Sequence, residues 1–408
     1  MRREPVAQRI VLDETGPGAE VPLSSTRLAT LLSHPGLVEL GPGTAPGAWR
    51  VRARRRVASV RLGSGEGAVD LRIRPKVGVE RLMYLLGFAG SGVDWHEDPL
   101  PVGTSDELVP AFAAVLAKTA SGTLRQGILR GYVEVDEDLA VVRGRLRAGD
   151  QMRRRFGAPL PLAVTHDDFS ADVAENRILL AALLLLARAP DVRREDARAL
   201  RRLAAGLDGV ARLAPGSDLP RWRPSRLNRH YVRVLKLAET VLAGSVPEPG
   251  APGAGIDLDG IVVNMERVYE DFLAGALRGV LRRRALACST RDSHHRLDTA
   301  GRVRLEPDIV VHASGGPHSV VDAKYKALGS GGPPNADLYQ VVSYCTALGL
   351  AHGHLVYAGG TAARESYRVV GAPITVHVHV LDTAGTVAEL RTRVERVADA
   401  VTRNGAVP

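Results

Sequence analysis

The 408 residues of this chain are 45% hydrophobic and 24% charged, which are the proportions of a globular protein, and the length exceeds one typical domain. This composition excludes a largely disordered chain, and the two isolated cysteines exclude a disulfide framework. The net charge of +9 suits a polyanionic partner such as nucleic acid, although heavy arginine usage alone would also produce it.

The first residues carry charge without an apolar segment, so we expect no signal peptide. The longest apolar run covers residues 178–187, whereas a membrane-spanning helix needs about 20 residues. We therefore expect a cytoplasmic protein with no membrane partner.

Residues 1–130 are expected to form a β-rich domain with helices. Apolar and charged residues alternate over residues 57–62 and 69–74, which predicts strands with one solvated face. Helical spacing follows over residues 79–88 and 108–129.

Residues 131–250 are expected to form a mainly helical middle region that begins with a hairpin-like stretch at residues 131–146. Apolar or amphipathic patterns predict three helices, at residues 176–187, 191–207 and 226–243. Prolines and glycines crowd residues 244–255, which predicts a linker.

Residues 251–408 alternate between helical and strand patterns, which predicts an α/β domain with its own core. The expected helices are residues 265–284, 337–349 and 387–403, and the expected strands are residues 303–312, 318–324, 354–358 and 374–381. The whole chain is therefore predicted to be a multi-domain α+β protein.

The chemistry is predicted to lie on two neighbouring strands of this last domain. Asp308 stands at the start of an apolar strand, and Asp322 and Lys324 share one face of the next because side chains alternate along a strand. Two converging carboxylates repel each other unless a cation lies between them, and hard oxygen ligands suit Mg²⁺, with Mn²⁺ as a substitute. Lys324 beside such an ion would orient water or stabilise charge on a phosphate.

Pro307-Asp308 followed by Asp322-Ala323-Lys324 resembles the motif of the PD-(D/E)xK nuclease superfamily. The resemblance implies a restriction-endonuclease-like domain at the C-terminus, with a third metal-binding acid on the preceding helix. Glu270 is favoured for that role, and Glu266, one turn earlier, is the alternative. Gln340 and Tyr344 resemble the Q-x-x-x-Y helix of RecB-like nucleases, which implies that Gln340 supports catalysis.

Several segments of the middle region, and one that leads into the C-terminal domain, resemble the McrC family, the nuclease subunit of McrBC modification-dependent (5-methylcytosine) restriction systems. They are residues 131–133, 143–145, 168–172, 176–179, 226–231 and 264–272. The resemblance implies a DNA endonuclease for anti-phage defence that binds and stimulates a hexameric AAA+ GTPase, McrB, and cleaves double-stranded DNA carrying methylated or otherwise modified bases. It also implies that the N-terminal portion binds this partner.

The chain has no G-x-x-x-x-G-K-[ST] motif, which agrees with a separate NTPase subunit. Two alternatives stay open at this point. One is a RecB-like nuclease of another defence or repair system, and the other is a non-catalytic activator of an AAA+ ring. Because Asp308, Asp322 and Lys324 are all present, the sequence favours a catalytic protein.

Overall fold

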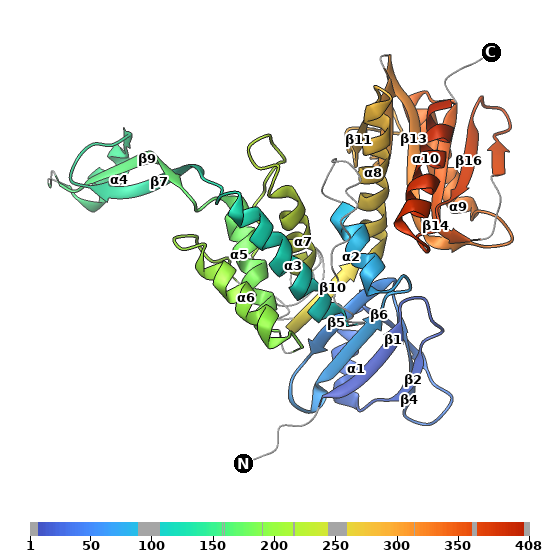
Figure 1. The fold of residues 1–408 in the computed structure, drawn as a ribbon, viewed down its shortest axis with the longest axis horizontal. Coiled ribbons are helices and arrows are strands. Elements are labelled where there is room, and N and C mark those ends of the chain that lie inside the picture. The colour runs from blue at the N-terminus through green and yellow to red at the C-terminus, as the bar shows by residue number, and fades with distance from the viewer. Residues whose placement is uncertain are drawn as a thin grey trace. The chain divides into compact units, whose positions relative to one another are not determined.

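The computed structural model describes residues 7–88, 107–156, 158, 160–189, 191–214, 217–243, 259–313, 315–360 and 365–403. The chain divides into two compact units. The first unit is discontinuous and combines Met1–Ala111 with Leu258–Pro408, whereas the second unit is Phe112–Asp257. Ten α-helices and four β-sheets lie among the described residues, which confirms the predicted mixture of helices and sheets (Figure 1).

The N-terminal part of the first unit contains two small sheets, with strand order β1-β6-β5-β10 and β2-β4-β3. Their apolar residues alternate with charged ones, so one face of each strand packs into a shared core that includes Ile10, Val51 and Leu71. The elements are β1 (Gln8–Asp13), β2 (Ala19–Pro22), α1 (Ser25–Leu32), β3 (Val38–Pro42), β4 (Ala48–Ala53), β5 (Arg56–Leu62), β6 (Val69–Arg74) and α2 (Val79–Phe88).

The fourth strand of the first sheet, β10 (Asp259–Asn264), comes from a distant part of the sequence. It pairs antiparallel with β5 over its whole length. The next residue begins helix α8 (Met265–Arg283), whose first turn is capped by the Asn264 side chain through the backbone N–H groups of Glu266 and Arg267. The N-terminal sheet is therefore joined without a loop to the first helix of the C-terminal part.

A six-stranded sheet forms the C-terminal part of the first unit, with order β11-β12-β13-β14-β16-β15. Strands β13, β14 and β16 are mutually parallel, and the remaining pairs are antiparallel. The elements are β11 (Ala287–Thr290), β12 (Ile309–Ala313), β13 (Gly316–Leu328), α9 (Asn335–Leu348), β14 (His352–Gly360), β15 (Glu365–Arg368), β16 (Thr375–Val380) and α10 (Val387–Arg403).

The two faces of this sheet pack against different helices. Val320, on one face of β13, packs with Val341 and Tyr344 of α9. Ser319, on the opposite face, donates to the carbonyl of Val401 in α10, and α8 packs against both α10 and β13. The alternation along β13 thus directs Asp322, Lys324 and Lys326 toward α9.

The second unit contains a helical group and a three-stranded sheet of order β7-β9-β8. A buried apolar face on α5 includes Ile178, Leu179 and Leu183, and α5 packs against α6 and α7. The elements are α3 (Leu108–Arg125), β7 (Gly131–Leu139), β8 (Arg145–Leu146), α4 (Ala148–Arg154), β9 (Leu162–Ser170), α5 (Ala174–Leu186), α6 (Arg194–Ala205) and α7 (Val232–Ala243).

The hairpin predicted at residues 131–146 is wrong in its pairing. Strand β7 pairs with β9 along its full length, and β8 with α4 lies between them in sequence. Strand β9 was not predicted, because the polar run His166–Asp168 interrupts its apolar pattern. The predicted linker at residues 244–255 lies outside the described residues, and the predicted three-part division of the chain stays a prediction.

Gly260 in β10 provides a test of the connection between the N-terminal sheet and α8. Its φ is +152°, and a Cβ there would lie 2.0 Å from the carbonyl oxygen of Ser59 in β5. We expect Gly260→Ala to lower the free energy of unfolding by more than about 2 kcal/mol, since it strains the backbone and disrupts pairing.

Gly279 in α8 is the matched control, because a Cβ there meets no atom within 4 Å. Gly279→Ala should raise the free energy of unfolding by about 0.5–1 kcal/mol. Urea unfolding monitored by circular dichroism measures both changes. Equal stability of the Gly260→Ala and wild-type proteins would contradict the expected role of the β5–β10 contact.

Candidate active site

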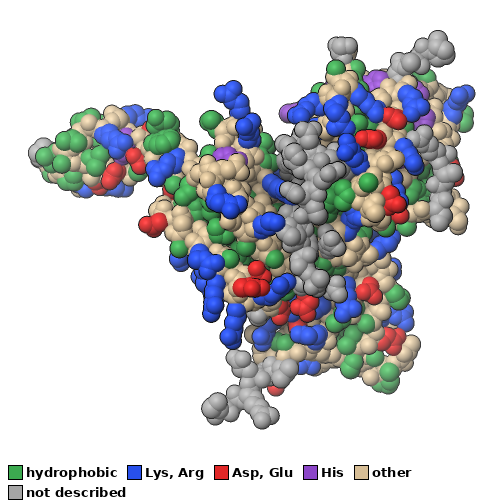
Figure 2. All heavy atoms as spheres, viewed as in Figure 1, with side chains coloured by type: hydrophobic (Ala, Val, Ile, Leu, Met, Phe, Trp, Pro, Cys, Tyr) green, Lys and Arg blue, Asp and Glu red, His purple; other side chains and the backbone are tan. Residues whose placement is uncertain are grey.

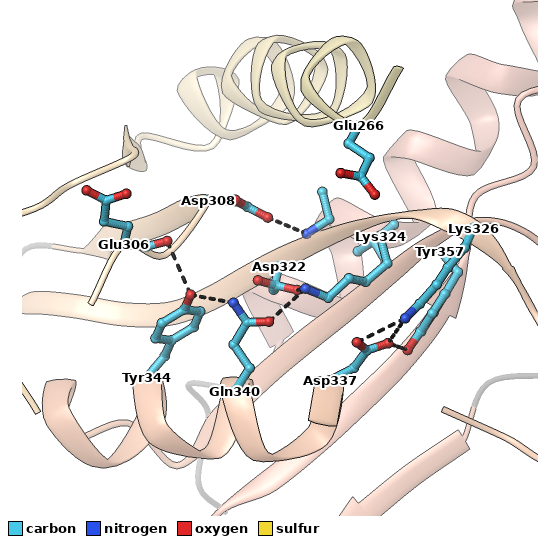
Figure 3. Close-up of polar contacts among 12 residues, drawn as sticks. Glu266, Glu306, Asp308, Asp322, Lys324, Lys326, Asp337, Gln340, Tyr344 and Tyr357 are labelled. Atoms are coloured by element: carbon cyan, nitrogen blue, oxygen red, sulfur yellow. Dashed lines mark hydrogen bonds and ion pairs between the residues drawn. The ribbon is translucent and has the colours of Figure 1, made fainter. Parts of the chain in front are cut away.

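The site begins where β12 and β13 run side by side. Ile309 pairs with Val321, so Asp308, immediately before β12, comes beside Asp322. The Asp308 Oδ2 atom accepts a hydrogen bond of 2.8 Å from the backbone N–H of Ala323, which fixes this carboxylate against β13 (Figure 3). Two carboxyl groups are therefore brought together by strand pairing, as the sequence analysis expected.

Asp322 and Lys324 form an ion pair on the α9 side of β13. The Lys324 Nζ atom lies 2.7 Å from Asp322 Oδ2, and Asp322 is only 1% exposed. Nζ also donates a 2.8 Å hydrogen bond to Gln340 Oε1 on α9. The ammonium group is thus held from two sides (Figure 3).

Gln340 begins a chain of hydrogen bonds that returns to the first strand. Its Nε2 atom donates to the Tyr344 hydroxyl at 2.8 Å, and that hydroxyl donates to the carbonyl of Glu306 at 3.2 Å. Because Glu306 lies two residues before Asp308, the chain links the ammonium of Lys324 to the backbone that carries Asp308. The i, i+4 spacing predicted that Gln340 and Tyr344 face the same way, and here they contact each other.

The two candidate acids of α8 have different environments. Glu266 forms an ion pair of 2.9 Å with Arg55, and its side chain is 47% exposed. Glu270 is half-buried, and its charge acts on both Asp308 and Asp322. Glu270 is therefore the acid that belongs electrostatically to the two-strand site.

Burial and crowding of like charges disfavour ionisation of these acids. Burial, followed by the charge of Asp322, raises the pKa of Asp308 to about 7. Burial and the charge of Asp308 raise the pKa of Glu270. Burial also raises the pKa of Asp322, despite the opposing effect of Lys324. Lys324, beside Asp322, and Arg291, beside Glu270, lower these pKa values but do not reverse the shifts.

Two further contacts at the site were not predicted. Arg291, which follows β11 with a positive φ of 49°, contacts Glu270 Oε2 at 3.1 Å and Asp271 Oδ1 at 2.8 Å. Lys326 contacts Asp337 Oδ2 at 2.7 Å, and the Tyr357 hydroxyl donates to the same oxygen at 2.5 Å.

Because side chains alternate along a strand, the sequence could have indicated that Lys326 shares a face of β13 with Asp322 and Lys324. Asp337 lies one turn before Gln340 on α9, so helical spacing could have indicated that the two side chains share a face of the helix. No sequence pattern could have indicated the contact made by Arg291, because this residue adopts a left-handed conformation after a short strand.

The carboxylate oxygens of Asp308, Asp322 and Glu270 are the donor type that Mg²⁺ prefers. Within the described ranges, no group of three or more His, Cys, Asp or Glu side chains is already converged on one point. Mg²⁺ is usually bound through one or two carboxylates with waters completing the octahedron, so Asp308 and Asp322 fit it without a closed cage.

A family model for the McrBC 5-methylcytosine restriction system component matches residues 51–358, more than half of the chain. The chain belongs to this family. The match includes Glu270, Asp308, Asp322 and Lys324, together with Gln340. No curated protein matches the chain.

Two solved structures are similar to this McrBC family member. One is a refined half-complex from a tetradecameric assembly of Thermococcus gammatolerans McrB AAA+ hexamers with bound McrC. Its matching chain is 18% identical with a TM-score of 0.55, and the match covers 97% of this chain and 100% of the other.

The other is a cryo-EM structure of the Thermococcus gammatolerans McrBC complex, with 19% identity and a TM-score of 0.40. That match covers 66% of this chain and 87% of the other. The first likeness shows a shared fold. In the parts of the chain that the structure describes, no helix has the length and apolarity to cross a membrane.

The raised pKa of Asp308 predicts how the stability of the cation-free protein depends on pH. Its pKa of about 7 exceeds the ordinary value of 3.8, so the folded state binds the extra proton. Stability is therefore lost as the pH rises from about 4 through 7. In EDTA, Asp308→Asn should raise the Tm at pH 8, by about 1–2 °C for each kcal/mol recovered in a chain of this length, and much less at pH 4.5.

Asp298→Asn is the control, because Asp298 also accepts a backbone N–H, from Val303 at 2.7 Å, but lies on the surface of a turn. Differential scanning calorimetry at the two pH values measures both variants. An Asp308→Asn protein whose Tm equals that of wild type at pH 8 would show that Asp308 carries no destabilising charge there.

Proposed function

We propose that this chain is the nuclease subunit of an McrBC-type restriction complex, a Mg²⁺-dependent endodeoxyribonuclease that hydrolyses phosphodiester bonds in double-stranded DNA. The convergence of Asp308, Asp322 and Lys324 at one point of the sheet carries the proposal. The family match supports the biological setting, and the expectation of a PD-(D/E)xK-type domain rests on the same three residues.

Asp308 and Asp322 would hold the Mg²⁺ ion, with Glu270 as the third acid. When bound, Mg²⁺ activates water and stabilises negative charge on a phosphoryl oxygen. Lys324 lies 2.7 Å from Asp322, so its ammonium would face the same reacting group and orient the attacking water or offset the phosphate charge. Gln340 keeps that ammonium in place from the α9 side.

Removal of the Lys324 ammonium tests the catalytic assignment. Lys324→Ala should lower the rate of cleavage of methylated plasmid, in the presence of Mg²⁺ and the GTPase partner, by roughly 100-fold or more, because it deletes a charge aimed at the reacting phosphate. Stimulation of GTP hydrolysis should persist, which shows that the variant folds and assembles.

The matched control is Lys118→Ala, which removes an exposed lysine from α3 in the second unit. It should cleave at the wild-type rate. Full cleavage by Lys324→Ala would refute the catalytic assignment. A wild-type chain that stimulates GTP hydrolysis without cleaving DNA would instead support the non-catalytic activator described above.

A separate surface supports the proposed binding of an AAA+ ring. The Thermococcus gammatolerans assembly contains McrB AAA+ hexamers with bound McrC, and we infer that this chain also binds an McrB-like AAA+ GTPase hexamer. We call residues 131–170, with β7, β8, α4 and β9, the arm (Figure 1). The arm lies outside the N-terminal portion that the sequence analysis expected to bind the partner, so the contact proposed here differs from that expectation.

Eight of the seventeen exposed large hydrophobic side chains among the described residues lie on the arm. They include Phe156, which is 83% exposed, Val141 and Val142. Arg143, Arg145 and Arg153 lie among them, and Figure 2 shows green and blue side chains mixed over the β7–β9 region. Such apolar concentration on a small folded element is typical of a protein contact surface.

Substitutions on the arm test this contact. The double variant Val142→Ser with Phe156→Ser should raise the concentration needed for half-maximal GTPase stimulation by roughly tenfold, since it removes apolar area from the interface. Mn²⁺ binding to the isolated chain should be unchanged.

Val370→Ser is the control, because Val370 is 99% exposed but lies outside the arm. Titration of the partner's GTP turnover with each variant measures the effect. Wild-type stimulation by the double variant would exclude the arm as the contact surface.

A further inference from the structure

Glu14 is a buried acid that the proposed chemistry does not use. It follows β1 and is 2% exposed. Its Oε2 atom accepts hydrogen bonds from the backbone N–H of Lys76 at 3.1 Å and from the Tyr325 hydroxyl at 3.2 Å. Its Oε1 atom is buried without a hydrogen-bond partner in the described structure. A buried carboxyl group with an unsatisfied oxygen costs stability, so its presence calls for a physical reason.

Tyr325 connects this acid to the strand that carries the site. It directly follows Lys324, at a position where the register of β13 and β14 shifts. Lys324 pairs with Tyr357, whereas Ala327 pairs with Gly359, so β13 contains one extra residue between these pairs. A bulge of this kind re-aims side chains next to it. The hydrogen bond to Glu14 fixes the position of the Tyr325 ring beside this bulge.

The Tyr325 ring also reaches the helix that carries the third acid. Its centroid lies 5.9 Å from that of Tyr269, with the ring planes tilted by 47°. Tyr269 is fully buried and immediately precedes Glu270 on α8. Each tyrosine is therefore the sequence neighbour of a candidate site residue, Tyr325 of Lys324 and Tyr269 of Glu270. The two rings pack against each other on the side of the sheet opposite α9.

Other contacts attach α8 to the N-terminal part of the unit. Strand β10 pairs with β5 and runs directly into α8. Arg55, in the turn between β4 and β5, contacts Glu266 in the first turn of α8 at 2.9 Å. Of these links, only the one through Glu14 and Tyr325 reaches both β13 and α8 next to site residues.

We propose that Glu14 is a positioning residue for the nuclease centre, which acts through Tyr325 on Lys324 and, through the packing of Tyr325 on Tyr269, on Glu270. The N-terminal β-sheets thereby set the geometry of the site as well as supporting the fold. This inference rests on the proposed nuclease function. Its competing explanation is a contact that only stabilises the joined parts of the unit.

Three variants separate positioning from stability in the full-length chain. Tyr325→Phe keeps the ring and removes the hydroxyl. Glu14→Ala removes the acceptor. Glu14→Gln keeps an acceptor oxygen for both donors and removes the buried charge, so it should keep the Tyr325 hydroxyl in place.

Tyr367→Phe is the matched control, because the Tyr367 hydroxyl donates to Glu365 Oε2 at 2.5 Å in an exposed pair at the edge of the same sheet. Its cleavage rate and Mn²⁺ affinity should equal those of wild type.

Three quantities are measured for each variant. They are the Tm, the single-turnover cleavage rate with partner, saturating DNA and Mg²⁺, and the Mn²⁺ affinity of the chain alone by electron paramagnetic resonance. We expect Tyr325→Phe and Glu14→Ala to lower the rate by about tenfold, corresponding to 1.4 kcal/mol, and to weaken Mn²⁺ binding severalfold. Glu14→Gln should stay within twofold of wild type in both the rate and the Mn²⁺ affinity. The double variant Glu14→Ala with Tyr325→Phe should be no worse than either single variant.

A lower Tm for Tyr325→Phe with unchanged cleavage rate and Mn²⁺ affinity would overturn the proposal in favour of a purely stabilising contact. Loss of rate in Glu14→Gln equal to that in Glu14→Ala would overturn it as well, since the loss would then not come from a change in the position of Tyr325. Failure of the nuclease function itself would appear differently, as absence of cleavage by wild type, and the Mn²⁺ affinities would still decide whether Glu14 positions the site.

Discussion

The candidate site depends on three carboxylates, Asp308, Asp322 and Glu270, that outnumber the two cations beside them, Lys324 and Arg291. Asp322 is almost inaccessible, Asp308 is fixed next to it by the N–H of Ala323, and the charge of Glu270 acts on both. Lys324 and Arg291 compensate only part of this charge. Such an arrangement is unfavourable unless protons or a cation neutralise it, which is why the same contacts explain both the raised pKa of Asp308 and the proposed affinity for Mg²⁺.

The positions of these charges depend on the discontinuous first unit. Strand β10 completes a sheet whose other strands come from the first 74 residues, and α8 leaves that sheet with its N-terminus capped by Asn264. This helix is therefore held by residues from two distant parts of the sequence. A C-terminal segment that began at Met265 would lack the β5–β10 pairing and the contact between Glu14 and Tyr325.

The sequence predicted the contacts that follow from local periodicity. Alternation placed Asp322 and Lys324 on one face, helical spacing placed Gln340 with Tyr344, and α2 has the predicted bounds. The sequence did not predict the contacts that depend on tertiary packing. Glu14 and Tyr325 are 311 positions apart, and Arg291 approaches Glu270 from a left-handed turn that no pattern marks. Strand β9 was missed because the polar run His166–Asp168 interrupts its apolar pattern.

The unfavourable site is tolerated because it lies at the edge of an extensive apolar core. Asp322 follows Val320 and Val321, both inaccessible, and Leu355 and Tyr357 of β14 are also fully buried. Burial of each such side chain contributes about 1.5–3 kcal/mol, so several together exceed the destabilisation from one crowded carboxyl. Replacing the acids with apolar residues would relieve that destabilisation but remove the proposed oxygen ligands. The crowded carboxylates therefore lower the stability of the fold at the candidate site, and the surrounding strands hold these acids in an arrangement that they would not adopt alone.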